Sequence, residues 1–145
     1  MSKRIMLTLI CAALLAGASS KDVVNISDAW VRTPNPAVSV TAGFMTIENP
    51  TSRAIALTGV ISPAAAVVEL HEMKMADGQM SMRKVDRIEI PAGARVKLEP
   101  GGLHLMLFDL KETLEAGSRV EFVLQFDDGT EAKIAAIVRS PEGMH

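Results

Sequence analysis

Cysteine is almost absent from this sequence, whose 145 residues include one cysteine, Cys11, and no tyrosine. Cys11 lies inside an apolar stretch at 5–15, which follows two basic residues and is too short to span a bilayer. An Ala-x-Ala pattern at 16–18 completes the features of a secretory signal peptide. Residues 1–18 are therefore predicted to be a signal that is cleaved. The alternative is an uncleaved anchor or a buried N-terminal helix.

The lack of cysteine after the signal excludes several classes of protein. A chain without thiols forms no disulfide outside the cytoplasm. A blue-copper electron carrier needs a cysteine thiolate beside two histidines, and covalent haem needs a C-x-x-C-H motif. A lipid anchor needs a cysteine directly after the apolar stretch, whereas Cys11 lies within it. We expect a periplasmic protein without a lipid and, since no second long apolar stretch follows, without stable membrane insertion.

An excess of positive charge is also lacking, and aromatic side chains are scarce. The formal net charge is -2, so the chain has no basic excess and nucleic acid is not an expected partner. Aromatic residues make up 3% of the chain, and we expect Trp30 and Phe44, each in an apolar strand pattern, to lie in the core. The composition is globular and the length suits one domain.

Helical periodicity is scarce after the signal, and short apolar runs rich in Val, Ile, Thr and Leu alternate with turn residues. Asp77-Gly78 and Asp128-Gly129 are hairpin signals, because glycine accepts the positive φ of a tight turn. The pattern predicts an all-β, single-domain β-sandwich or Greek-key barrel over 19–140, with a short C-terminal tail at 141–145. The predicted strands cover 23–31, 43–48, 54–61, 67–75, 79–85, 88–90, 95–98, 104–110, 119–126 and 131–138.

Methionine, by contrast, is abundant, and it gathers near histidine. Side chains alternate along a strand, so His104 and Met106 share one face. A hairpin through the turn at 77–78 would lay two methionine-bearing strands side by side. Its register is not fixed by the sequence, so the methionine that faces His71 stays open. The residues on the facing sides of these strands are His71, Met73 and Met75 on the first and Met80 and Met82 on the second.

The chemistry of these side chains favours copper. Thioether sulfur is a neutral, soft donor that binds Cu(I) well and binds zinc, magnesium or calcium poorly. Imidazole suits copper in either oxidation state. The alternative is structural, because methionine also fills gaps in cores and histidine is often a satisfied polar group. Both His71 and His104 carry a methionine two residues later, and this repeated pairing favours a Cu(I) site.

The residues His71, Met82, His104 and Met106 are spaced as His-x10-Met-x21-His-x-Met. This spacing resembles the copper-binding motif of the PCuAC family of periplasmic copper chaperones. The likeness covers essentially the whole mature chain. It extends over further segments at 29–32, 44–49, 68–73, 91–93, 100–106 and 126–129.

The resemblance implies a cupredoxin-like β-barrel in which these four residues hold one Cu(I) near the surface. It also implies delivery of copper to the dinuclear centre in the copper domain of cytochrome c oxidase subunit II, with a Sco-type protein as a further partner. Assembly of the oxidase would then be the role of the protein.

Other methionines fall outside the ligand positions that the resemblance implies. Met73, Met75 and Met80 are expected to line or shield the site, or to help in transfer. Some members of the family carry a long tail rich in His and Met that takes Cu(II). Here only Met144-His145 corresponds to that tail, so a second site for Cu(II) is not expected.

The leading interpretation is a binding protein that accepts, protects and passes on Cu(I), and not an enzyme. Nothing in the sequence indicates a substrate pocket or a second redox centre. A periplasmic copper buffer that serves resistance would use the same site. The sequence leaves these two functions open.

Overall fold

The computed structural model describes residues 24–140, which form ten strands without a helix. The predicted signal and the predicted tail lie outside these residues. No helix of the described part is long and apolar enough to cross a membrane. Each strand matches a predicted segment to within a few residues. The strands are β1 (Asn25–Arg32), β2 (Val40–Glu48), β3 (Ile55–Ile61), β4 (Ala65–Ala76), β5 (Gln79–Lys84), β6 (Ile88–Ile90), β7 (Arg95–Leu98), β8 (Leu103–Leu110), β9 (Arg119–Phe126) and β10 (Glu131–Arg139).

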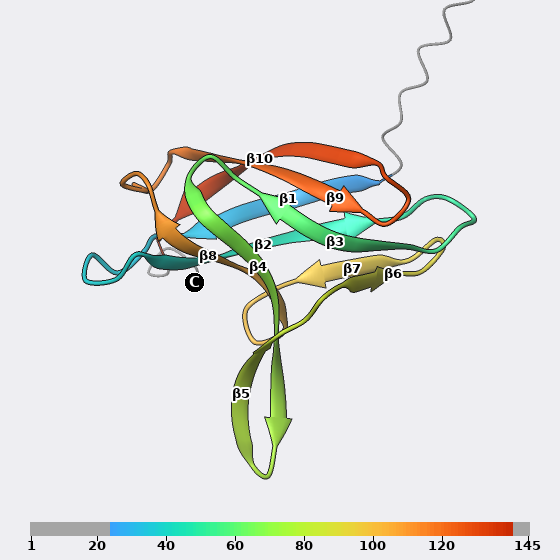
Figure 1. Ribbon diagram of the computed structural model, residues 1–145, viewed down its shortest axis with the longest axis horizontal. Helices are drawn as coiled ribbons and strands as arrows, with labels where there is room; N and C mark the ends of the chain where they lie inside the picture. Colours follow the sequence, from blue (N-terminus) through green and yellow to red (C-terminus); the bar gives the residue numbers. More distant parts are fainter. Residues whose placement is uncertain (1–23, 141–145) are drawn as a thin grey trace, which may run out of the picture.

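Seven of the strands close into a barrel, in the order β4-β8-β2-β1-β10-β9-β3 (Figure 1). The ring closes where β3 returns to β4, with Val60 opposite Val68. The pairing of β1 with β10 is parallel, whereas the other pairings are antiparallel. Strand β6 extends the sheet at β3, β7 pairs with β2, and β5 continues beyond β4. The predicted all-β, cupredoxin-like single-domain barrel is confirmed.

The barrel interior is filled by every second side chain of its strands. On β8 the alternation turns Leu105 and Leu107 inward, where both are fully buried, as the sequence predicted. Strand β9 contributes Phe122 and Leu124 to the same core, and β2, the neighbour of β8, contributes Ile47. The residues that alternate with them on β8, His104 and Met106, therefore face outward.

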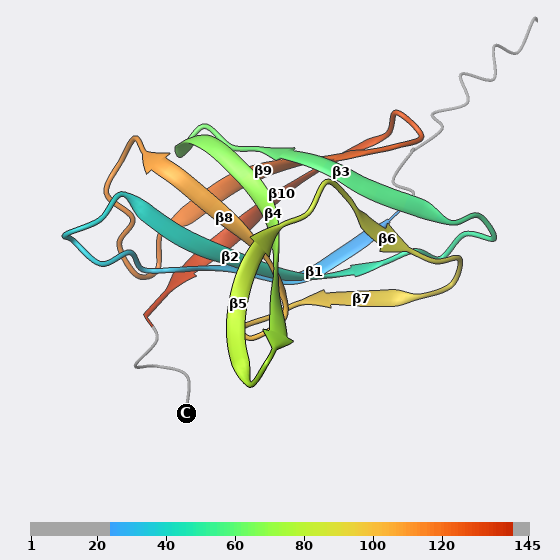
Figure 2. The same ribbon diagram turned by 60° about the horizontal axis from the view of Figure 1, so that its bottom comes forward.

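The β4–β5 hairpin projects from the barrel, as Figures 1 and 2 show from two sides. Its turn is Asp77-Gly78, where φ is 52° and 77°, as a two-residue turn of type I′ requires. This turn sets the register that the sequence left open, with Met73 opposite Met82 and Met75 opposite Met80. The predicted hairpin is thus confirmed.

The second predicted hairpin joins β9 to β10 at Asp128-Gly129, where Gly129 has a φ of 84°. The Asp128 carboxylate accepts hydrogen bonds from the Thr130 hydroxyl at 2.6 Å and the Thr130 backbone N–H at 2.9 Å. These bonds favour the ionised carboxylate and lower the pKa of Asp128. The turn lies on strands that do not contribute to the site described next.

Candidate metal centre

The outer face of three strands brings the predicted ligands together. Strand β8 lies between β2 and β4, and the register of β4 with β8 places His71 directly opposite His104. Met106 follows His104 on the same face of β8. Met82 reaches this face from β5, because the hairpin continues the sheet past β4. The site therefore lies on the wall of the barrel and not inside it.

One contact between two of the predicted ligands joins a nitrogen and a sulfur. His104 Nε2 lies 3.2 Å from Met82 Sδ, although the two residues are 22 apart in sequence. His104 is buried, at 5% exposed, whereas Met82 is 48% exposed. A metal bonded to nitrogen at ~2.0 Å and to sulfur at ~2.3 Å in a tetrahedral site holds these atoms about 3.5 Å apart. The two donor atoms thus lie near the spacing that one shared ion needs.

A backbone carbonyl fixes the tautomer of His104. Its Nδ1–H donates a hydrogen bond of 2.9 Å to the Gly102 carbonyl oxygen, which can only accept. In the neutral ring Nε2 then carries the lone pair, on the side of Met82. The same Gly102 oxygen accepts a bond of 3.2 Å from the Met73 backbone N–H. One carbonyl therefore ties the base of the hairpin to the imidazole beside it.

His71 has the opposite tautomer, which a carboxylate sets. Its Nε2 donates to Glu69 Oε2 at 2.7 Å, and its Nδ1 is buried with no hydrogen-bond partner. The rings of His71 and His104 lie 5.8 Å apart, centroid to centroid. A buried polar atom without a partner is rare in folded proteins and marks a place where a ligand fits. Each imidazole thus offers one unengaged nitrogen.

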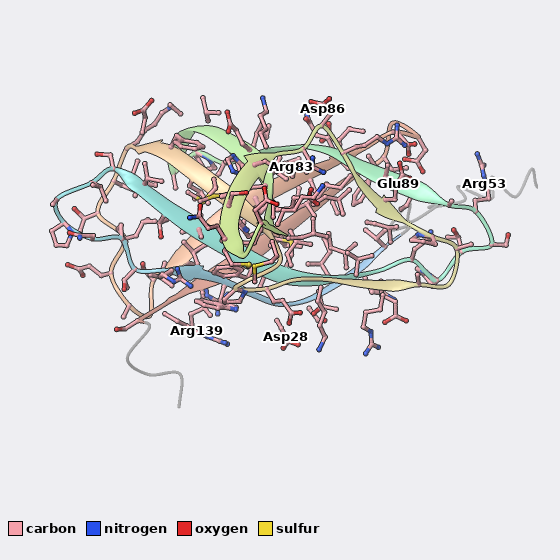
Figure 3. All side chains as sticks on the ribbon, turned by 90° about the horizontal axis from the view of Figure 1, so that it is seen from below. Asp28, Arg53, Arg83, Asp86, Glu89 and Arg139 are labelled. Atoms are coloured by element: carbon pink, nitrogen blue, oxygen red, sulfur yellow. The ribbon has the colours of Figure 1, made fainter. Side chains whose placement is uncertain are left out.

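A hollow of about 380 Å³ lies beside three of the predicted ligands, and His71 is not among the residues that line it. Its lining includes Met73, Met82, His104 and Met106, with Phe44 and the segment after β1 on the other side. Met73 thus lines the site, as expected, although it is not a predicted ligand. Figure 3 shows sulfur atoms gathered near the centre of the molecule, around the hairpin, while Arg53 lies toward the edge.

A pair of aromatic side chains packs against Met106. Trp30 and Phe44 are buried, as predicted, but they form a cluster of their own with Ala42 and Met106, separate from the barrel core. Their rings lie 4.5 Å apart, and the Arg32 guanidinium stands 5.3 Å over Phe44. This cluster was not foreseen, because the sequence pattern marks a residue as buried without saying on which side of the sheet.

Glu69, which accepts a hydrogen bond from His71, is a residue beside the predicted ligands that the sequence reasoning missed. It lies two residues before His71 on the same strand face, and that spacing was the available signal. Met75 and Met80 lie farther along the hairpin and do not line the hollow. His145 falls outside the described residues. Within 24–140 no three His, Cys, Asp or Glu side chains gather in a group that could hold a metal, so the donor set depends on methionine.

The family described as putative lipoprotein LpqE-like matches residues 24–138 of the chain. The putative lipoprotein Lxx21020 of Leifsonia xyli subsp. xyli (strain CTCB07) is 36% identical over 123 residues, which are 84% of this chain and 73% of that protein. The uncharacterized protein RP573 of Rickettsia prowazekii (strain Madrid E) is 32% identical over 95 residues, which are 65% of this chain and 52% of that protein. This chain thus spans about half the length of RP573.

Two solved structures show a similar fold. The copper-bound PCuAC domain from PmoF2 superposes with a TM-score of 0.70 at 28% identity, over 82% of this chain and 94% of that domain. The solution structure of CuI-DR1885 from Deinococcus radiodurans gives a TM-score of 0.64 at 33% identity, over 88% of this chain and 85% of that one. The resemblance noted from the spacing of His and Met is confirmed at the level of the family.

Proposed function

We propose that this chain, which belongs to the LpqE-like, PCuAC-type family, is a copper chaperone that binds one Cu(I) and passes it to another protein. His71, Met82, His104 and Met106 would hold the ion. The observation that carries the proposal is the contact of 3.2 Å between the unprotonated His104 Nε2 and the Met82 sulfur. The PmoF2 domain is described as copper-bound and the DR1885 structure as CuI-DR1885, which supports the choice of metal.

The donor set favours Cu(I) over other ions. Two thioethers and two imidazoles are neutral, so they do not compensate the double charge of a hard cation. The soft sulfurs prefer Cu(I), and after the predicted signal the sequence has no cysteine whose thiolate would bind the ion more tightly. Met82 is half exposed, so an incoming donor can displace its sulfur first. We expect release by stepwise exchange of ligands, with this chain acting as a carrier rather than an enzyme.

The recipient that we propose is the copper domain of cytochrome c oxidase subunit II, outside the cytoplasm, with a Sco-type protein as a second partner. The name putative lipoprotein, which the family and the Leifsonia protein carry, supports export. A periplasmic copper buffer is the second candidate function. The half-exposed sulfur at the site favours the chaperone, because a buffer gains nothing from a ligand that is easily displaced.

The binding half of the proposal is tested by titrating the mature protein with Cu(I) against a competing chelator. The wild-type chain should take up one equivalent. A Met82→Ala, His104→Ala double variant should lose this uptake, because the central pair of donors is gone. Met45→Leu is the matched control, because Met45 is buried in the barrel core and leucine has a similar volume. Uptake that is unchanged in the double variant would refute the site.

The transfer half has its own measurement. The loaded protein is mixed with the apo copper domain of an oxidase, and copper on each protein is followed after separation. We expect copper to move to the oxidase domain. Retention of copper by this chain, with intact binding of Cu(I), would favour the buffer instead.

A further inference from the structure

Two methionines near the tip of the β4–β5 hairpin lie outside both hydrophobic clusters of the described chain. Met75 is 63% exposed and Met80 is 49% exposed. Methionine is usually buried, and the exposure of two such side chains costs stability without any gain in packing. Their position therefore calls for a role other than folding.

The turn geometry brings these two side chains face to face. Ala76 and Gln79 flank the two-residue turn and form its closing hydrogen-bonded pair. Pairs alternate along an antiparallel ladder, so Met75 and Met80 form a non-hydrogen-bonded pair, in which side chains lie closest, with Cα atoms about 4.5 Å apart. Each methionine has three rotatable bonds to adjust its sulfur. Both sulfurs can therefore reach a single ion.

A second pair of the same kind lies one step closer to the barrel. Met73 and Met82 are opposite each other and share the face of Met75 and Met80. Two residues along a strand span about 7 Å, so the tip pair lies within the reach of two long side chains from the candidate metal centre. The hairpin thus carries two successive pairs of methionines on one face, and the inner pair contacts His104 through Met82.

The other face of the hairpin has a different chemistry. Glu72 pairs with Arg83 there, and Lys74 lies opposite Ser81. Charged and polar groups thus occupy one face, while all four methionines of the hairpin occupy the other. This segregation cannot be explained by burial, since the tip is exposed on both sides.

We infer that Met75 and Met80 form a second, weaker Cu(I) site, which serves as the entry and exit point for copper. This inference rests on the proposed function and deepens it. Copper stays Cu(I) throughout, and at each step a bond from copper to a thioether sulfur or an imidazole nitrogen forms while another copper–ligand bond breaks. Two thioethers hold the ion less firmly than two thioethers with two imidazoles. Copper therefore pauses at the tip and settles at the site beside His104.

Binding at the tip is tested with Ag(I), a soft monovalent ion with the same filled d shell as Cu(I). The mature protein is labelled with carbon-13 on its methionine methyl groups. The first equivalent should shift Met82 and Met106, and the second should shift Met75 and Met80. The second shift should vanish in a Met75→Leu, Met80→Leu variant. A wild-type chain in which the second equivalent leaves both tip methyls unmoved would overturn the inference.

The tip site can be separated from the main site in the same experiment. In the Met82→Ala, His104→Ala variant the tip methyls should still shift with Ag(I), because their donors are intact. A failure of the main site alone would refute the proposed function, whereas a failure of the tip alone would refute only this inference.

The role in transfer is tested by the rate at which a Cu(I) chelator removes copper from the loaded protein. The Met75→Leu, Met80→Leu variant should lose copper about tenfold more slowly, because the tip thioethers, held at high effective concentration beside the main site, no longer accept the ion and present it to the chelator. Its affinity for the first Cu(I) should be unchanged. A matched Met75→Ser, Met80→Ser variant should be slowed to the same extent. A rate that falls only in the serine variant would mean that exposed apolar area matters and not sulfur, and would overturn the inference.

Discussion

The two imidazoles of the candidate metal centre each give one ring N–H to an oxygen that can only accept. His71 uses Nε2 toward Glu69, and His104 uses Nδ1 toward Gly102. The remaining nitrogen of each ring keeps its lone pair for a ligand. Bonds of this kind fix the tautomer and the orientation of a metal-binding histidine before the metal arrives.

Removal of the Glu69 carboxylate should weaken copper binding without unfolding the protein. In a Glu69→Leu variant the His71 Nε2–H loses its acceptor, and we expect the affinity for Cu(I) to fall by about 10- to 100-fold. Glu69→Gln keeps an accepting oxygen and should recover most of the affinity. A chelator competition with Cu(I) measures the change.

The matched control is Glu72→Leu, since Glu72 lies on the opposite face of the same strand and pairs with Arg83. Its affinity for Cu(I) should match that of the wild-type chain. Equal affinities for the Glu69→Leu and wild-type proteins would mean that this carboxylate does not orient His71.

The residues of the site were predictable to different degrees. Strand alternation placed His104 and Met106 on one face and could not choose between Met73 and Met82. The choice came from the resemblance, and the structure places both in the hollow, with the Met82 sulfur 3.2 Å from His104 Nε2. Glu69 was not foreseen, because its bond depends on how two side chains of one strand bend toward each other.

Among the elements, the β4–β5 hairpin depends most on its turn. Gly78 has a φ of 77°, in the left-handed region that a side chain disfavours. A Gly78→Ala variant should therefore destabilise the hairpin by about 1 kcal/mol. We expect faster amide hydrogen exchange along β5 and, because Met82 is held less well, weaker binding of Cu(I).

Asp77→Asn is the control for this variant. Asparagine tolerates positive φ, so it should leave both the exchange rates and the affinity close to those of the wild-type chain. Unchanged exchange along β5 in the Gly78→Ala protein would contradict the dependence of the hairpin on this glycine.

The strands themselves were predictable because turn residues punctuate the sequence so often. The ten predicted segments correspond to the ten observed strands, and both Asp-Gly turns are present. Strand partners were not predictable in the same way. The closure of β3 on β4 and the parallel pairing of β1 with β10 join residues far apart in the sequence, and no local signal records such contacts.

At the scale of the whole molecule, the barrel keeps two apolar regions apart. The main core fills the interior, while the small cluster of Trp30, Ala42 and Phe44 lies against Met106 on the outside. The sheet itself separates them. Stability and metal binding should therefore respond to different substitutions.

A substitution in the interior tests this separation. Leu124 is fully buried in β9, and Leu124→Ala should lower the free energy of unfolding by about 2–5 kcal/mol. The affinity for Cu(I) should not change, because β9 does not contribute to the site. Denaturant unfolding and chelator competition measure the two quantities.

Phe44→Ala makes the contrasting substitution in the outer cluster. Phe44 lines the hollow and packs beside Met106, so its loss should lower both the stability and the affinity. A Leu124→Ala protein that folds but binds Cu(I) much more weakly would show that the interior and the outer face are coupled.

The position of the donors on the outer wall has a consequence for how the protein can change. The side chain of Met82 comes from β5, a strand that lies outside the closed ring of the barrel. One of the four proposed ligands, and with it part of the preference for a metal, thus depends on a strand outside the barrel ring. New specificities can be explored there, by evolution or by design, one hairpin residue at a time and without rebuilding the fold.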